Sequence, residues 1–214
     1  MDNEVNQMKI LLVNFSSKEK GSTYHVLSDM AEQFKKNGAD AEIFWMGNTV
    51  NGGCRGCLAC RKTGKCIFED DKVNELAEAS KSSDGFIFAS PVHYAAASGN
   101  LGAALDRVFY SAAKNFSFKP GAAVAVARRG GCSAALDQIN KYFSINSMPI
   151  VPSTYWNMIH SAKPGDHIKD EEGVQTMTNL VNNMVWMVRC IDTAKAQGID
   201  HPAAIKEIRT DFNS

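Results

Sequence analysis

Four cysteines crowd into one short segment of this chain, and they are the first candidates for chemistry. They are Cys54, Cys57, Cys60 and Cys66, with the spacing C-x2-C-x2-C-x5-C. A step of three residues lets successive thiolates in a loop converge on one compact object, and four thiolates are the usual ligands of an iron–sulfur cluster. A four-cysteine zinc site has the same ligand count but usually comes as two separated pairs. Four reduced thiols, or thiols paired as disulfides, are the other alternative.

A second candidate site is the polar segment 16–23, S-S-K-E-K-G-S-T, which lies between an apolar run and a helical pattern. The first backbone N–H groups of a helix point outward and favour an anion. Hydroxyl groups can donate to phosphate oxygens, and the segment also supplies a cation and a flexible glycine. An ordinary polar loop with a helix cap is the alternative. The expected phosphate contacts are Ser16, Lys18, Gly21, Ser22 and Thr23.

Two further segments follow apolar runs in the same way, at 90–94 and at 128–131. Pro91 rigidifies the first segment, and Tyr94 offers an aromatic face against which a flat heterocycle could sit. The second segment, R-R-G-G, is a turn rich in hydrogen-bond donors. The cofactor contacts expected from the two segments are Ser90, Pro91, Val92, His93, Tyr94, Arg128, Gly130 and Gly131.

The elements that must position these residues alternate between strands and helices. The patterns predict strands over 9–14, 40–45, 84–90, 122–127 and 148–151. They predict helices over 22–38, from Asp70 or Asp71 to 80, over 100–109, from the turn at 131 to about 143, over 171–196, and a small one after Pro202. This alternation indicates an α/β protein whose parallel sheet is covered on both faces. Because such sheets bind ligands at the carboxyl ends of their strands, the polar segments should meet there.

We expect a single domain over residues 1–214, with its core at about 9–192. A cysteine-rich loop occupies 47–68, and a loop over 148–170 is large enough to cover a site.

Three motifs resemble those of the NADPH-dependent FMN reductases of the flavodoxin superfamily, which include the iron–sulfur flavoproteins. The segment 14–23, N-F-S-S-K-E-K-G-S-T, resembles their N-G-S-P-R-x-x-G-N-T loop, with departures at Phe15, Ser17, Lys18 and Ser22. The segment 90–94 resembles S-P-V-Y-[FWY], and 101–107 resembles L-K-x-x-[IL]-D-R. The resemblance covers about residues 9–190. Lys18 in place of arginine keeps the charge but loses the bidentate fork.

This resemblance implies a flavodoxin-like three-layer sandwich with a five-stranded parallel sheet in the order 2-1-3-4-5. It implies that FMN binds at the open end of that sheet and that the protein is an FMN-dependent oxidoreductase. Such a protein is either an NAD(P)H-dependent reductase of FMN or quinones, or an iron–sulfur flavoprotein that transfers electrons. For the latter it implies a 4Fe-4S cluster on Cys54, Cys57, Cys60 and Cys66. A flavodoxin-type electron carrier without its own substrate is the alternative. No catalytic residue is assigned, and Asp106-Arg107 is expected to form a helix-end ion pair.

The composition excludes several classes of protein. The 23 basic and 23 acidic side chains give a formal net charge of zero, so no basic face for nucleic acid is expected. No apolar run is long enough to span a membrane, and no secretory signal is evident, which favours the cytoplasm.

The expected partners are a small-molecule electron acceptor or a redox protein. Because aromatic and methionine side chains are enriched at interfaces, the segments 148–161 and 171–196 predict a homodimer or homotetramer.

Overall fold

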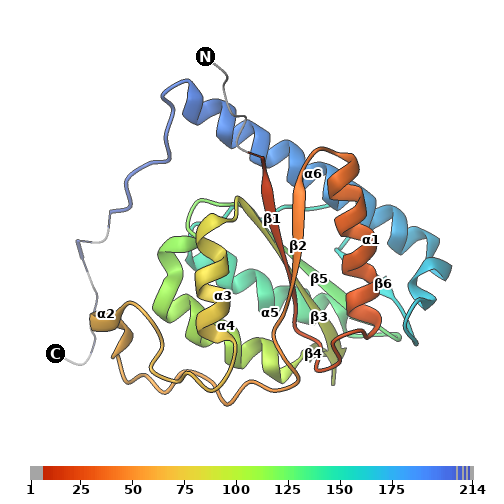
Figure 1. Cartoon of the computed structure of the whole chain (residues 1–214), viewed down its shortest axis with the longest axis horizontal. Helices are drawn as coiled ribbons and strands as arrows, with labels where there is room; N and C mark the ends of the chain where they lie inside the picture. The colour runs from red at the N-terminus through yellow and green to blue at the C-terminus, as the bar shows by residue number, and fades with distance from the viewer. Residues whose placement is uncertain (1–6, 206, 209, 211, 213–214) are drawn as a thin grey trace.

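The computed structural model describes residues 7–205, 207–208, 210 and 212. A five-stranded parallel sheet forms its centre, in the order β2-β1-β3-β5-β6 (Figure 1). The strands are β1 (Lys9–Asn14), β2 (Asp40–Trp45), β3 (Gly85–His93), β5 (Gly121–Ala127) and β6 (Met158–His160). The predicted order 2-1-3-4-5 is therefore confirmed for the parallel strands. A two-residue strand, β4 (Ala96–Ala97), pairs antiparallel with the end of β3.

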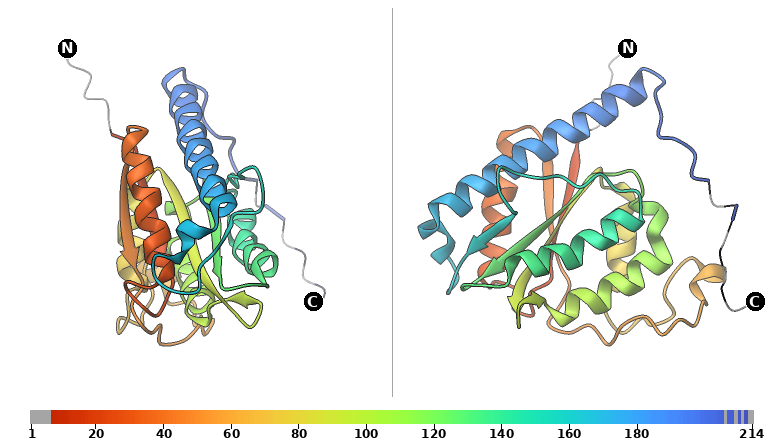
Figure 2. Two further views of the ribbon diagram at one scale, coloured as in Figure 1. Left: turned by 90° about the vertical axis from the view of Figure 1, so that its right-hand side faces the viewer. Right: turned by 180° about the vertical axis from the view of Figure 1, so that it is seen from behind.

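Helices cover both faces of this sheet (Figure 2). One core lies beneath α1 (Ser22–Lys36) and α6 (Glu171–Ala196). The other lies beneath α3 (Val73–Ala79), α4 (Gly99–Ala112) and α5 (Cys132–Ile145). The alternation of side chains along each strand explains the two cores, because Ile10 and Leu12 enter the first and Leu11 and Val13 enter the second. Shorter helices are α2 (Cys60–Thr63), η1 (Ser80–Ser82), η2 (Ala113–Asn115) and η3 (Asp166–Lys169).

The fifth strand was predicted over 148–151, and that prediction is wrong. The segment makes only an isolated bridge, Gly121 to Ile150, and the regular strand is β6, seven residues past Val151 at Met158. Pro149 and Pro152 flank the bridge, and neither has a backbone N–H to donate to a ladder. The chain therefore leaves the edge of the sheet and pairs with β5 only after the intervening loop.

Two other boundaries differ from the sequence pattern. Pro91 does not end β3, because Val92 and His93 continue the strand by pairing with β4. Beyond Pro202, the residues that the structure describes contain no helix. Within the described residues, no helix is long and apolar enough to cross a membrane.

Candidate functional site

Three polar loops meet at the carboxyl end of the sheet, as the sequence predicts. Ser98 joins two of them, since its amide donates to Ser90 Oγ at 2.9 Å and its hydroxyl donates to the carbonyl of Phe15 at 3.1 Å. The third loop touches the second at Gly131, where a Cβ would lie 2.6 Å from the Cα of Ala95. These contacts hold the segments 14–23, 90–98 and 128–131 together as one surface.

The loop after β1 is organised by the last residue of that strand. The side chain of Asn14 accepts from the amide of Ser16 at 3.0 Å and donates to the carbonyl of Glu19 at 3.1 Å. The hydroxyl of Ser16 in turn accepts from the amide of Lys18 at 3.1 Å. Asn14 was not among the predicted site residues, although an asparagine at the carboxyl end of a buried strand is a usable signal. Its two hydrogen bonds shape the loop that leads into α1.

Helix α1 begins without a side-chain cap. Its N-cap residue is Gly21, and no side chain among the described residues caps the amides of its first turn. A Cβ at Gly21 would lie 3.2 Å from the Cβ of Lys18 and 3.5 Å from Ser16 Oγ, so the turn is fitted to glycine. Ser22 is half-buried and Thr23 is buried, while Lys18 is exposed. Free amides, hydroxyls and one cation at a helix N-terminus fit a single phosphate group.

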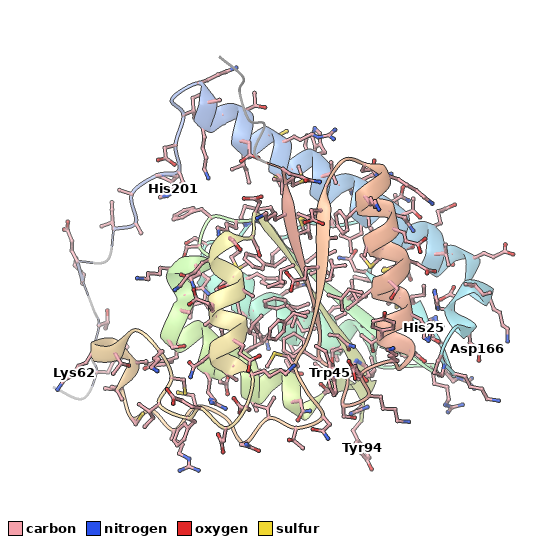
Figure 3. The ribbon with its side chains drawn as sticks, in the orientation of Figure 1. His25, Trp45, Lys62, Tyr94, Asp166 and His201 are labelled. Atoms are coloured by element: carbon pink, nitrogen blue, oxygen red, sulfur yellow. The ribbon has the colours of Figure 1, made fainter. Side chains whose placement is uncertain are left out.

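The loop after β3 is a tight hairpin. Tyr94 and Ala95 have φ values of 50° and 58°, as a two-residue hairpin turn requires, although neither is glycine. Such conformations in non-glycine residues cost free energy and often mark functional sites. The side chain of Tyr94 points away from the body of the protein (Figure 3) and is fully exposed. Ser90 is buried and closes the loop, whereas Tyr94 and His93 face solvent.

His160 supports the loop after β5 from the neighbouring strand. Its Nε2 lies 3.0 Å from the carbonyl of Arg129, and its Nδ1 lies 3.1 Å from a carboxylate oxygen of Asp170. Both ring nitrogens therefore have a polar partner, and the ring joins the turn after β5 to the start of α6. Asp170 also caps α6 by accepting from the amide of Gly173 at 3.0 Å. Burial opposes the charge of Asp170, but hydrogen bonds from His160 and Gly173 outweigh it and lower the pKa of this carboxyl.

Trp45 is a site residue that sequence reasoning missed. It ends β2, and its Nε1 donates to the carbonyl of Ser16 at 2.9 Å, which attaches the first loop to the second strand. The ammonium of Lys72 lies 5.5 Å from the centre of its ring. Figure 3 places Trp45 and Tyr94 at the same end of the molecule. An aromatic residue at the last position of a strand in this sheet would have been the signal.

The cysteine-rich loop leaves β2 at this same end and then runs along α4. The side chain of Asn100 accepts from the amide of Val50 at 3.3 Å and donates to the carbonyl of Asn48 at 3.1 Å, which fixes the start of the loop to the start of α4. The cysteine end of the loop lies beside Arg107 and Tyr110, seven and ten residues further along the helix. At 1.5 Å per residue this is about 10–15 Å from Asn100.

All four predicted cysteines line one pocket, together with Leu58, Phe68, Arg107 and Tyr110 among others. Cys54 and Cys57 are exposed, and Cys60 and Cys66 are half-buried. The pocket has a volume of about 20 Å³, close to the room that one water molecule needs. In the part of the chain that the structure describes, no three His, Cys, Asp or Glu side chains are gathered closely enough to hold a metal ion. Four thiolates fit an iron–sulfur cluster in chemistry and number. To bind one, the four sulfurs would have to move closer to one another, and the pocket between them would have to become larger.

The predicted ion pair between Asp106 and Arg107 is wrong. Adjacent residues on a helix point in different directions, so the two side chains meet different neighbours. Arg107 pairs with Asp71 inside the protein, and Asp106 accepts a 2.5 Å hydrogen bond from the hydroxyl of Tyr142. Burial and the hydrogen bond to Asp106 both raise the pKa of Tyr142, which keeps this phenol protonated.

Comparison with known proteins finds matches over most of this chain. The family of NADPH-dependent FMN reductases matches residues 8–163. An iron–sulfur flavoprotein of Methanocaldococcus jannaschii is 30% identical over 195 residues, which cover 86% of this chain and 99% of that protein. An iron–sulfur flavoprotein of Methanosarcina thermophila is 29% identical over 194 residues, which cover 86% of this chain and 97% of that protein.

Solved structures share the fold at low sequence identity. RosB, solved with a bound derivative of riboflavin 5′-phosphate, aligns with a TM-score of 0.70 and 13% identity, over 97% of this chain and 92% of its own. An NADH:FMN oxidoreductase aligns with a TM-score of 0.61 and 16% identity, over 84% of this chain and 89% of its own. A flavodoxin from the Archaea aligns with a TM-score of 0.56 and 15% identity, over 85% of this chain and 99% of its own. These likenesses establish a flavodoxin-like fold.

Proposed function

The chain belongs to the NADPH-dependent FMN reductase family, and from this premise we propose an FMN-dependent oxidoreductase that accepts electrons from NAD(P)H and carries a 4Fe-4S cluster. The observation that carries the proposal is the uncapped start of α1, which follows the first of three loops that hydrogen bonds and a glycine contact hold together. When bound, FMN supplies hydride and electron chemistry, and the cluster supplies one-electron transfer. The protein's own part is to bind, orient and separate these groups.

The residues that would bind FMN fall into three groups. Ser16, Ser22, Thr23, Lys18 and the amides that follow Gly21 would receive the phosphate. The segments Ser90–Tyr94 and Arg128–Gly131 would flank the flavin ring, with backbone donors from the glycine-rich turn. Because His160 holds the carbonyl of Arg129, it would keep the amides of that turn directed toward the ring.

Flavin titration of the apoprotein tests this arrangement. We expect FMN to bind much more tightly than riboflavin, which lacks the phosphate, and more tightly than FAD. Ser22→Ala should weaken FMN binding, because a hydrogen bond to a charged group contributes about 1.5–3 kcal/mol. Ser28→Ala, further along α1, is the matched control, since its hydroxyl bonds only to the carbonyl of Tyr24 within the helix. Equal affinity for riboflavin and FMN would contradict the phosphate site.

Cys54, Cys57, Cys60 and Cys66 would hold the cluster. Their common pocket supports this proposal, and so does the match to proteins that are called iron–sulfur flavoproteins. The test is anaerobic reconstitution with iron and sulfide, followed by iron analysis and an absorption spectrum. We expect iron to be retained by the unmodified chain and lost after Cys→Ser at each of the four positions. Cys190→Ser, at an exposed position on α6, is the control.

The alternative function is an electron carrier without its own substrate. The archaeal flavodoxin shares only the fold, so it does not favour this alternative over a reductase. Anaerobic mixing with NADH or NADPH distinguishes the two. In a reductase the nicotinamide alone reduces the bound flavin, and the flavin absorbance falls. In a carrier the absorbance falls only when a redox protein is added. Quinones and free flavin are the acceptors that we would test first.

We also propose that the protein is a homodimer or homotetramer. The loop 152–154 is attached to α6 by hydrogen bonds from Asn183 to the carbonyl of Pro152 and from Asn179 to the hydroxyl of Thr154. Two exposed tryptophans lie on these segments: Trp156, two residues past Thr154, is 59% exposed, and Trp186 on α6 is 63% exposed. Aromatic residues are enriched at protein interfaces. Light scattering should show an oligomer that the double change Trp156→Ala and Trp186→Ala dissociates. A monomeric unmodified protein would contradict this.

A further inference from the structure

A buried arginine touches the pocket of the cysteine loop, and neither the motif nor the family match explains it. The side chain of Arg107 is only 2% exposed and that of Asp71 only 1% exposed, and the two form an ion pair between Nη1 and Oδ2. Burying a charged pair is costly, and it is tolerated only where further hydrogen bonds satisfy both groups. The partners of the remaining guanidinium donors therefore indicate the role of this ion pair.

Those donors are directed at the cysteine loop. The Nη2 of Arg107 donates to the carbonyl of Phe68 at 2.9 Å, and its Nε donates to the sulfur of Cys66 at 3.3 Å. The guanidinium also lies 5.6 Å from the centre of the Phe68 ring. One planar group thus holds a carboxylate, a backbone carbonyl and a sulfur at the same time, which the single ammonium of lysine could not reproduce.

The carboxylate of Asp71 is itself part of a fixed framework. It accepts from the amide of Asn51 at 3.0 Å and from the amide of Val73 at 3.2 Å, and so it connects the two ends of the cysteine loop. Burial opposes its charge, but the hydrogen bonds from Arg107 and these amides outweigh burial and lower the pKa of Asp71. Asp71 is therefore ionised at neutral pH and fixes the orientation of the guanidinium.

Asn74 holds the backbone on the other side of the same cysteine. Its side chain accepts from the amide of Cys66 at 3.0 Å and donates to the carbonyl of Cys66 at 2.9 Å. Cys66 is the only one of the four cysteines whose backbone and sulfur are both held by side chains within the described residues. The other three lie on segments that are exposed or bonded through the backbone.

We propose that Arg107 is a positioning residue for the cluster: it anchors the Cys66–Asp71 segment and donates a permanent hydrogen bond to the Cys66 sulfur. This rests on the proposed function, because it assumes that the four cysteines bind a cluster. Hydrogen bonds to ligand sulfurs and nearby positive charge stabilise the reduced, more negative state of a cluster. Arg107 therefore raises the reduction potential of the cluster and fixes one ligand before the other three close on it.

The experiment measures the cluster potential in reconstituted, anaerobic protein by redox titration. In Arg107→Lys the charge and the pair with Asp71 are kept but the donor to sulfur is lost, so we expect a lower potential. In the double variant Arg107→Gln, Asp71→Asn both charges are removed together, so the net charge beside the cluster is unchanged. The lost hydrogen bond to sulfur should then lower the potential by a similar amount, of about tenfold in the reduction equilibrium, or about 59 mV for one electron. Arg61→Gln is the control, because it removes an exposed positive charge beside Cys60 without removing a bond to sulfur.

Amide hydrogen exchange gives a second measurement that needs no cluster and no activity. Exchange over residues 66–71 should be faster in Arg107→Lys than in the unmodified apoprotein, and unchanged in Arg61→Gln. If the unmodified chain holds its cluster and the Arg107 variants show unchanged potentials, the positioning role is wrong while the proposed function stands. If the unmodified chain retains no iron, the cluster itself is wrong and the positioning role with it. An equal shift of the cluster potential in Arg61→Gln would show that any nearby positive charge has the same effect, and this would also overturn the proposal.

Discussion

The loops at the strand ends and the cysteine-rich loop are held by different means. The strand-end loops are short. Ser98 and the close contact at Gly131 connect them, and the side chain of Asn14 shapes the first of them from within. The cysteine-rich loop is long, and most of its residues between Asn51 and Lys65 are exposed. Its firm attachments are Asn100 at the start and the Arg107–Asp71 pair with Asn74 at the end.

This difference suits the two groups that the regions are proposed to hold. A preformed cradle of amides suits a phosphate, because the donors must point at it without a cost in ordering. A cluster instead brings its ligands together by forming four strong bonds, and metal binding can drive the folding of its own loop. One anchored cysteine would then be sufficient to begin assembly of the proposed cluster. We call the Arg107–Asp71 pair the anchor, and the strand-end loops 14–23, 90–98 and 128–131 the cradle. Changes in the anchor and changes in the cradle should therefore have separable effects.

The largest expected effect comes from the anchor. Arg107→Gln leaves the carboxylate of Asp71 buried without its partner, and we expect the free energy of unfolding to fall by about 3–5 kcal/mol. Urea denaturation of the apoprotein measures this. The double change Arg107→Gln, Asp71→Asn should recover a large part of the loss, because no isolated charge remains. A loss below about 1 kcal/mol in the single variant would show that the loop is held by other contacts.

The next effect belongs to the cradle. Gly131 has φ of 97°, and a Cβ there would lie 2.6 Å from the Cα of Ala95. Gly131→Ala should therefore displace the hairpin, with a loss of stability of about 1–3 kcal/mol and weaker FMN binding. Gly130→Ala is the matched control, because no atom lies within 4 Å of its Cβ position. Similar FMN affinities for the two variants would argue against a shared surface between these loops.

A smaller effect is expected at Asp170, with a defined dependence on pH. The pKa of this carboxyl is lowered in the folded protein, so its stabilising effect is present above its ordinary pKa of about 3.9 and is lost as the pH falls through the lowered value. Asp170→Ala should cost about 0.5–2 kcal/mol at pH 7, through the lost cap of α6, and much less at the acidic end. Denaturation at several pH values measures this, with Asp137→Ala on α5 as an exposed control that should show little change at any pH.

The smallest effect is expected from Lys18. Its ammonium is exposed, so screening by water limits its attraction for a phosphate, and Lys18→Ala should weaken FMN binding by at most about fivefold. The effect should shrink as salt is added, because exposed charges are screened. Lys20→Ala, also exposed in the same loop, is the comparison. A loss of binding as large as that from Ser22→Ala would show that the cradle depends on charge more than on directed hydrogen bonds.

The sequence by itself determined the local features of this protein. The boundaries of β2 and α6 were predicted to the residue, and the polar loops after β1, β3 and β5 were identified as neighbours, because strand periodicity and parallel topology depend on local patterns. Only the tertiary structure decided which distant side chains and strands pair with one another. Arg107 was assigned to Asp106 beside it, yet it pairs with Asp71, 36 residues away. Ser98 bonds to Phe15 across 83 residues, and the fifth strand forms at Met158–His160 instead of at the predicted 148–151. Such pairings depend on how helices and loops pack against one another, and residue types and spacing along the chain do not encode that packing directly.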